Sequence, residues 1–173
     1  LCVAVGLIVP LIYFVRVDED GMGVGVNLES EEFKQMRTHA KDAFNAKKYE
    51  QAIVLYENSV KMRPENAEVY NDLGATYYAF GLEYAGPSWP SWESDLAGKT
   101  VFEAREELKT AVSQTVSGYI ELKSDRRELT EAVEKQAKQL GATVHINMWE
   151  ERATISILLG KTQEFLTKAR DSY

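Results

Sequence analysis

The chain has 173 residues, of which 45% are apolar and 27% are charged, and this balance is typical of a folded globular protein. Its net charge of −7 at pH 7 argues against nucleic acid as a partner. With one cysteine, Cys2, and two histidines, His39 and His145, the sequence excludes an internal disulfide framework and a cysteine-rich zinc site, and we predict no metal and no cofactor.

The first fifteen residues, LCVAVGLIVPLIYFV, carry no charge. As a helix they would span about 22 Å, which is less than the roughly 30 Å of a hydrocarbon core. Because two aromatic residues and then Arg16 end the segment, as at a membrane interface, we predict a truncated transmembrane anchor over residues 1–16 that contacts lipid through residues 1–15. The core of a signal peptide and a buried core segment are the alternatives, and the lack of an A-x-A cleavage motif weakens the first of them.

Residues 17–30 are rich in acidic residues and glycine, and they predict a flexible linker. The alternating glycines of DGMGVGV do not have the G-x-G-x-x-G spacing of a nucleotide-binding loop. No basic residue lies between Arg16 and Lys34, so the positive-inside rule favours a single-pass membrane protein whose soluble part is extracytoplasmic, on the periplasmic side in a bacterium.

From residue 31 the apolar residues recur with a helical period, and we predict helices at 31–46, 49–62 and 67–80. Small and large side chains alternate at fixed offsets, as they do where antiparallel helices pack closely. Pro64 ends the second helix. The residues that carry this pattern are Tyr49, Ala52, Tyr56, Ser59 and Pro64 in a first unit, and Tyr70, Leu73, Gly74, Tyr77 and Gly81 in a second.

These residues and their spacing resemble the tetratricopeptide repeat, a helix-turn-helix unit of about 34 residues. The resemblance implies a domain that binds other proteins in a concave groove lined by the first helix of each unit. The residues at the groove positions are Lys34, Arg37, Lys41, Phe44 and Asn45 in the first unit and Asn71 and Tyr78 in the second. Arg37 and Lys41 favour an acidic peptide segment as the partner, and a solvated basic face without a ligand is the alternative.

The second unit is interrupted after its first helix by residues 82–99, which include GPSWPSW. Thr100 and Glu103 have the spacing of a capping box that opens the next helix. In that helix Ala104, Leu108 and Ala111 have the spacing of the second helix of the repeat. We therefore predict that residues 31–115 are repeat units with an insertion at 82–99.

Two alternating segments, GYIELKS and ATVHINM, flank the amphipathic DRRELTEAVEKQAKQLG. This order predicts a small βαβ excursion over residues 116–148, and a distorted all-helical repeat is the alternative. Residues 149–173 predict a further repeat-like helix pair, truncated at its end. The expected fold class is therefore mainly α: a helical repeat with an inserted loop and a small βαβ excursion, preceded by one transmembrane helix.

The remaining side chains of interest are two tryptophans and two histidines. Trp89 and Trp92 in the inserted segment either pack on the protein's own surface or contact a partner. His39 occupies a helix-packing position and is expected to be buried or half-buried, whereas His145 alternates with apolar neighbours and is expected on an exposed strand face. No set of residues predicts a nucleophile, a phosphate loop or a metal site, so we expect no enzymatic activity.

Taken together, these patterns predict a membrane-anchored module for protein–protein interaction, acting in assembly or as a scaffold. The alternative is a permanent accessory subunit of a larger membrane complex, for example a respiratory or photosynthetic one, because Gly6 and Pro10 are compatible with packing against other transmembrane helices.

Overall fold

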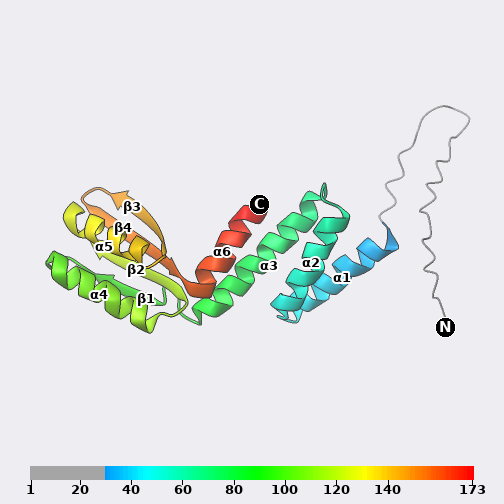
Figure 1. The fold of residues 1–173 in the computed structure, drawn as a ribbon, viewed down its shortest axis with the longest axis horizontal. Coiled ribbons are helices and arrows are strands. Elements are labelled where there is room, and N and C mark those ends of the chain that lie inside the picture. The colour runs from blue at the N-terminus through cyan, green and yellow to red at the C-terminus, as the bar shows by residue number, and fades with distance from the viewer. Residues whose placement is uncertain (1–29) are drawn as a thin grey trace, which may run out of the picture. The chain divides into compact units, whose positions relative to one another are not determined.

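The computed structural model describes residues 30–173, and residues 31–173 form one compact unit. The predicted anchor and nearly all of the predicted linker lie outside the described residues. The elements are α1 (Glu31–Asn45), α2 (Tyr49–Met62), α3 (Ala67–Ala85), β1 (Trp92–Asp95), α4 (Val101–Gln114), β2 (Gly118–Ser124), α5 (Arg127–Gln139), β3 (Thr143–Trp149), β4 (Arg152–Leu159) and α6 (Gly160–Ser172) (Figure 1). No helix within residues 30–173 is both long enough and apolar enough to cross a bilayer.

Helices α1, α2 and α3 form where the sequence pattern predicts them, although α3 continues to Ala85. The side chain of Asn66 caps α3 by accepting a hydrogen bond from the Val69 amide at 3.2 Å. Ala40 and Ala52 are fully buried where α1 packs on α2. Their small side chains let the two helices approach closely. Tyr77 on α3 donates a hydrogen bond to the Glu57 carboxylate on α2 at 2.6 Å, so the buried ring also has its hydroxyl satisfied.

The middle of the chain folds into a four-stranded sheet in the order β1-β2-β4-β3. β1 runs parallel to β2, and β4 is antiparallel to both of its neighbours, β2 and β3. Alternate side chains of β2 and β4 are buried under α4 and α5, which pack on the same face of the sheet. This core consists mainly of Leu96, Ala104, Leu108, Ala111, Ile120, Leu122, Leu129, Val133, Ala137, Ile155, Ile157 and Leu159. We call residues 86–159 the α/β module and the sheet face opposite α4 and α5 the open face.

The expected order of strand, helix and strand is present in β2, α5 and β3, with β4 inserted between the two strands. The expected helix pair over residues 149–173 is wrong in its first half, because Arg152–Leu159 is strand β4. Every second residue of its segment ATISILL is buried, and the segment pairs with β2 along its whole length and with β3 as far as Leu158. Only α6 in this region is helical.

The prediction that residues 100–115 supply the second helix of the repeat is also wrong. The capping box of α4 is present, with the Thr100 amide donating to Glu103 Oε2 at 2.7 Å and the Glu103 amide donating to Thr100 Oγ1 at 3.2 Å. The buried face of α4, however, packs on the sheet and not on α3. The spacing of Ala104, Leu108 and Ala111 occurs in any helix with one buried face, so it does not specify the partner.

The helix that packs antiparallel to α3 is α6, from the end of the chain (Figure 1). Phe165 and Ala169 on α6 belong to the same core as α1, α2 and α3. A side chain at Gly81 would lie 3.2 Å from Phe165 Cβ, so the absence of one allows the close approach of the two helices. The interruption of the repeat is therefore residues 86–159, a folded α/β module, and not a loop of residues 82–99.

Candidate functional site

The candidate site is the face that α1 and α3 present on the side away from their buried residues. Sequence reasoning placed seven side chains there: Lys34, Arg37, Lys41, Phe44, Asn45, Asn71 and Tyr78. The structure divides them into side chains that take part in the fold and side chains that remain accessible.

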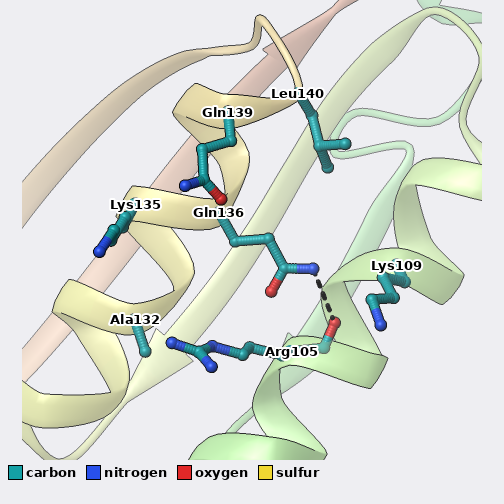
Figure 2. Close-up of a pocket in the computed structure, with 7 residues that line it drawn as sticks. All are labelled: Arg105, Lys109, Ala132, Lys135, Gln136, Gln139 and Leu140. Carbon is teal, nitrogen blue, oxygen red and sulfur yellow. Dashed lines mark hydrogen bonds between the residues drawn. The ribbon is translucent and has the colours of Figure 1, made fainter.

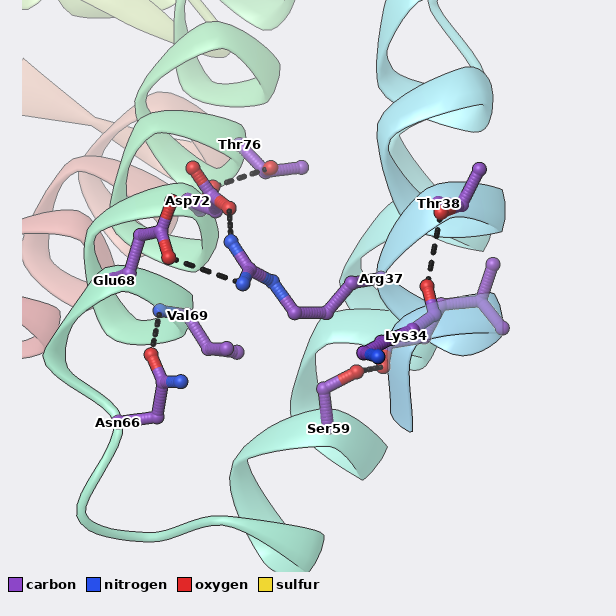
Figure 3. A network of polar contacts seen from close by, with 10 residues as sticks. Lys34, Arg37, Thr38, Ser59, Asn66, Glu68, Val69, Asp72 and Thr76 are labelled. Atoms are coloured by element: carbon purple, nitrogen blue, oxygen red, sulfur yellow. Dashed lines mark hydrogen bonds and ion pairs between the residues drawn. The ribbon is translucent and has the colours of Figure 1, made fainter. Parts of the chain in front are cut away.

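Arg37 takes part in the fold, because it joins α1 to α3 (Figure 3). Its guanidinium lies 3.0 Å from the Glu68 carboxylate and 3.3 Å from the Asp72 carboxylate, and only 19% of its side chain is exposed. The hydrogen bond from Arg37 lowers the pKa of Glu68, and the same hydrogen bond raises the pKa of Arg37, so both groups are held in their charged forms. The expectation that Arg37 is free to bind an acidic partner is therefore not met.

Two lysines complete the charge of this face. Lys34 lies 3.3 Å from the Glu31 carboxylate one turn earlier on α1, and Lys41 is exposed. Glu31 is thus paired with Lys34, and both Glu68 and Asp72 are paired with Arg37, whereas Lys41 forms no ion pair with a described residue. The face is close to neutral and not basic, and Lys41 is its exposed cation without an ion pair among the described residues.

Phe44 is half-buried and packs edge-to-face on Tyr49, with 5.8 Å between the ring centroids. It borders the helical core, so it supports the hairpin of α1 and α2. Asn45 and Asn71 are exposed, and Tyr78 is 51% exposed although α3 contributes more residues to this core than any other helix does. Lys41, Asn45, Asn71 and Tyr78 therefore form the accessible part of the site, which we call the helix-face site.

The two tryptophans of the inserted segment behave differently from each other. Trp92 begins β1, pairs with Ile120 of β2 and packs against the core of the α/β module. Trp89 stacks on Tyr119 of the open face, with 4.7 Å between the ring centroids, and remains 50% exposed. Both rings thus contact the protein's own surface, and Trp89 keeps half of its surface for solvent or a partner.

Both histidines are exposed. His39 is exposed, so the expectation that it is buried or half-buried is wrong: the buried positions of α1 are Phe33, Ala40 and Ala43. His145 is exposed on the open face, as its alternation with Val144 and Ile146 predicts. Within residues 30–173 no group of three or more His, Cys, Asp or Glu side chains is placed to hold a metal ion.

A second feature, which sequence reasoning missed, is a hollow of about 430 Å³ between α4 and α5 (Figure 2). Three cations line it, Arg105, Lys109 and Lys135. Gln136 reaches across it to the Arg105 carbonyl oxygen at 3.4 Å, and its own Oε1 is buried without a hydrogen-bond partner among the described residues. The spacing of Arg105 and Lys109 places both on one helix face, but the sequence does not show that α5 packs beside α4.

Comparison with known proteins finds a family model that matches part of the chain. The TPR repeat model matches residues 43–81, which span the end of α1, all of α2 and α3 as far as Gly81. The described structure agrees, because this stretch forms the two helices and the turn expected of such a unit. No curated protein and no solved structure matches the chain.

Proposed function

We propose that the chain is a non-catalytic module that binds another protein through the helix-face site, in assembly or as a scaffold at a membrane. The observation that supports this most is the TPR repeat at residues 43–81, because TPR repeats generally mediate protein–protein interaction. The position of the repeat matters, since it includes α3 and therefore Asn71 and Tyr78 of the site.

The accessible side chains indicate what kind of segment would fit. Lys41 suits one carboxylate of the partner, and an exposed contact of this kind contributes about 0.2–1 kcal/mol. Asn45 and Asn71 suit backbone amides and carbonyls of an extended peptide. Tyr78 offers a large and rigid contact area, and aromatic residues of this kind are frequent among the residues that dominate binding. We therefore propose a peptide segment with one acidic residue and one apolar residue, rather than a strongly acidic one.

The membrane part of the proposal rests on the sequence. The uncharged residues 1–15 followed by Arg16 support a single-pass anchor, with the helical repeat and the α/β module on the extracytoplasmic side. If the chain is instead a permanent subunit of a membrane complex, its partners will co-purify in fixed stoichiometry after extraction in detergent, whereas a partner of an exchangeable scaffold will dissociate on dilution.

The test of the helix-face site is capture of a partner identified with the unmodified, detergent-extracted chain. The variant Lys41→Glu with Tyr78→Ala removes the free cation and the exposed ring, and we expect it to weaken capture at least about tenfold. The matched control is Lys61→Glu with Val54→Ala on α2, which changes one exposed lysine and one exposed apolar residue outside the site. Equal capture by the two variants would refute the site. Arg37 is left unchanged because it forms the ion pairs with Glu68 and Asp72 that join α1 to α3.

A further inference from the structure

The two edges of the sheet are unlike each other. β1 forms one edge and has only four residues, of which Glu93 and Asp95 are charged, and Pro90 precedes it. β3 forms the other edge and has seven residues, TVHINMW, with no proline and no acidic or basic residue other than His145. Short length, charge and proline are the devices by which proteins protect an edge strand from pairing with another chain. Within residues 30–173, β1 has all three and β3 has none.

Exposed apolar side chains accompany the unprotected edge. Met148 is 63% exposed and Trp149 is 79% exposed, and both lie at the end of β3. An uncharged edge of this length that ends in exposed methionine and tryptophan is therefore a surface suited to a further strand.

We propose that β3 pairs antiparallel with β3 of a second copy of this chain, so that two four-stranded sheets become one sheet across a twofold axis at Ile146. Pairing with β4 assigns the faces of β3: Val144, Ile146 and Met148 lie opposite Ile157, Ile155 and Ala153 of the core. The open face carries the alternate residues Thr143, His145, Asn147 and Trp149.

The apolar residues of β3 are centred on Ile146, with Val144 on one side and Met148 on the other, and this arrangement favours a second copy as the occupant. In the antiparallel arrangement Ile146 faces Ile146 of the second copy, and Val144 faces Met148, so apolar side chains meet on the covered face. On the open face His145 faces Asn147, and Thr143 faces Trp149. No two like charges meet, and Thr143 opposite Trp149 is a β-branched and aromatic pair of the kind that stabilises antiparallel ladders.

The same geometry limits the assembly to two copies. A contact between identical strands about a twofold axis is isologous and closes on itself. The only other edge of the combined sheet would be β1 of each copy, which is short and charged. The pair would also carry two helix-face sites, so it would bind a partner that displays two copies of the recognised segment more tightly than a single chain does.

The test is a pair of charge variants on the open face, where neither side chain is buried. The variant His145→Asp with Asn147→Asp places like charges opposite each other at both cross-strand positions, and so does His145→Lys with Asn147→Lys. The full 173-residue chain is used in a mild detergent, and its mass is followed against concentration by light scattering. We expect the unmodified chain to form a concentration-dependent dimer and each variant alone to dissociate at least about tenfold more readily.

Mixing the two variants supplies the decisive result, because each acidic side chain then faces a basic one. We expect a 1:1 heterodimer to form from the mixture, which also shows that both variants are folded. A chain that stays monomeric at every concentration overturns the proposal. A dimer that is equally stable in the unmodified chain and in both variants also overturns the proposal, because residues 1–15 or another surface would then form the dimer interface. Substitution of Lys41 and Tyr78 leaves the dimer unchanged, so this result and that of the helix-face site are independent.

Discussion

Replacement of Phe165 by alanine is expected to lower the free energy of unfolding of the helical part by about 3–5 kcal/mol. The ring is 9% exposed and lies with its centroid 4.5 Å from that of Phe80 and 5.8 Å from that of Tyr84. It is the main side chain through which α6 joins the core of α1, α2 and α3, so its loss leaves a cavity and removes several aromatic contacts at once.

The measurement is urea unfolding followed by the signals of the helical and α/β parts. Phe102→Ala is the matched control, because Phe102 is 72% exposed on α4, the helix that the sequence pattern assigned to the repeat. We expect this control to change the free energy of unfolding by less than about 0.5 kcal/mol. A loss at Phe102 as large as the loss at Phe165 would contradict the packing of α6 on α3.

Gly160→Ala is expected to destabilise the chain by about 1–3 kcal/mol more than Gly98→Ala does. Both glycines have positive φ, +59° and +76°, so alanine has a backbone cost of about 1–2 kcal/mol at either position. At Gly98 nothing lies within 4 Å of an added methyl group. At Gly160 that group would collide with the Val116 carbonyl oxygen and with Ser117 Oγ.

The difference in stability between the two variants tests the structure of the junction between β4 and α6. Thermal unfolding of the two variants beside the unmodified chain measures it. Equal melting temperatures for Gly160→Ala and Gly98→Ala would show that the chain does not pass close to Val116 at this point.

The sequence predicted well the elements that local patterns determine. The three helices of the repeat follow from a helical period, and the alternation of GYIELKS predicts β2 at its observed bounds. The capping box of Thr100 and Glu103 predicts where α4 begins. Each of these signals lies within a few residues along the chain, so nothing distant is needed to recognise it.

What the sequence could not predict is which distant element completes the second unit. The buried residues of α4 and of α6 have similar helical spacing, so the spacing does not show which helix packs on α3. In the structure α4 packs on the sheet and α6 packs on α3. The segment ATISILL is a short apolar run that suits a strand or a buried helix equally, and its pairing with β2 and β3 decides for the strand.

The same reason explains the error in the candidate site. The repeat pattern assigns Arg37 to a groove position, but it does not show that Glu68 and Asp72 lie within 3.3 Å across the helices. Lys41, Asn45, Asn71 and Tyr78 are exposed, because no element of residues 30–173 buries them.

α3 and α6 form one helix pair although the α/β module separates them in sequence. Formation of a disulfide tests this most directly: Gly81→Cys with Phe165→Cys, in a Cys2→Ser background. A side-chain carbon at Gly81 would lie 3.2 Å from Phe165 Cβ, close to the roughly 3.5–4.5 Å between the Cβ atoms of a disulfide. We predict that mild oxidation links the two peptides, as detected by mass spectrometry, and that Gly81→Cys with Leu108→Cys in the same background stays reduced. A disulfide between positions 81 and 108, and none between 81 and 165, would show that α4 and not α6 packs on α3.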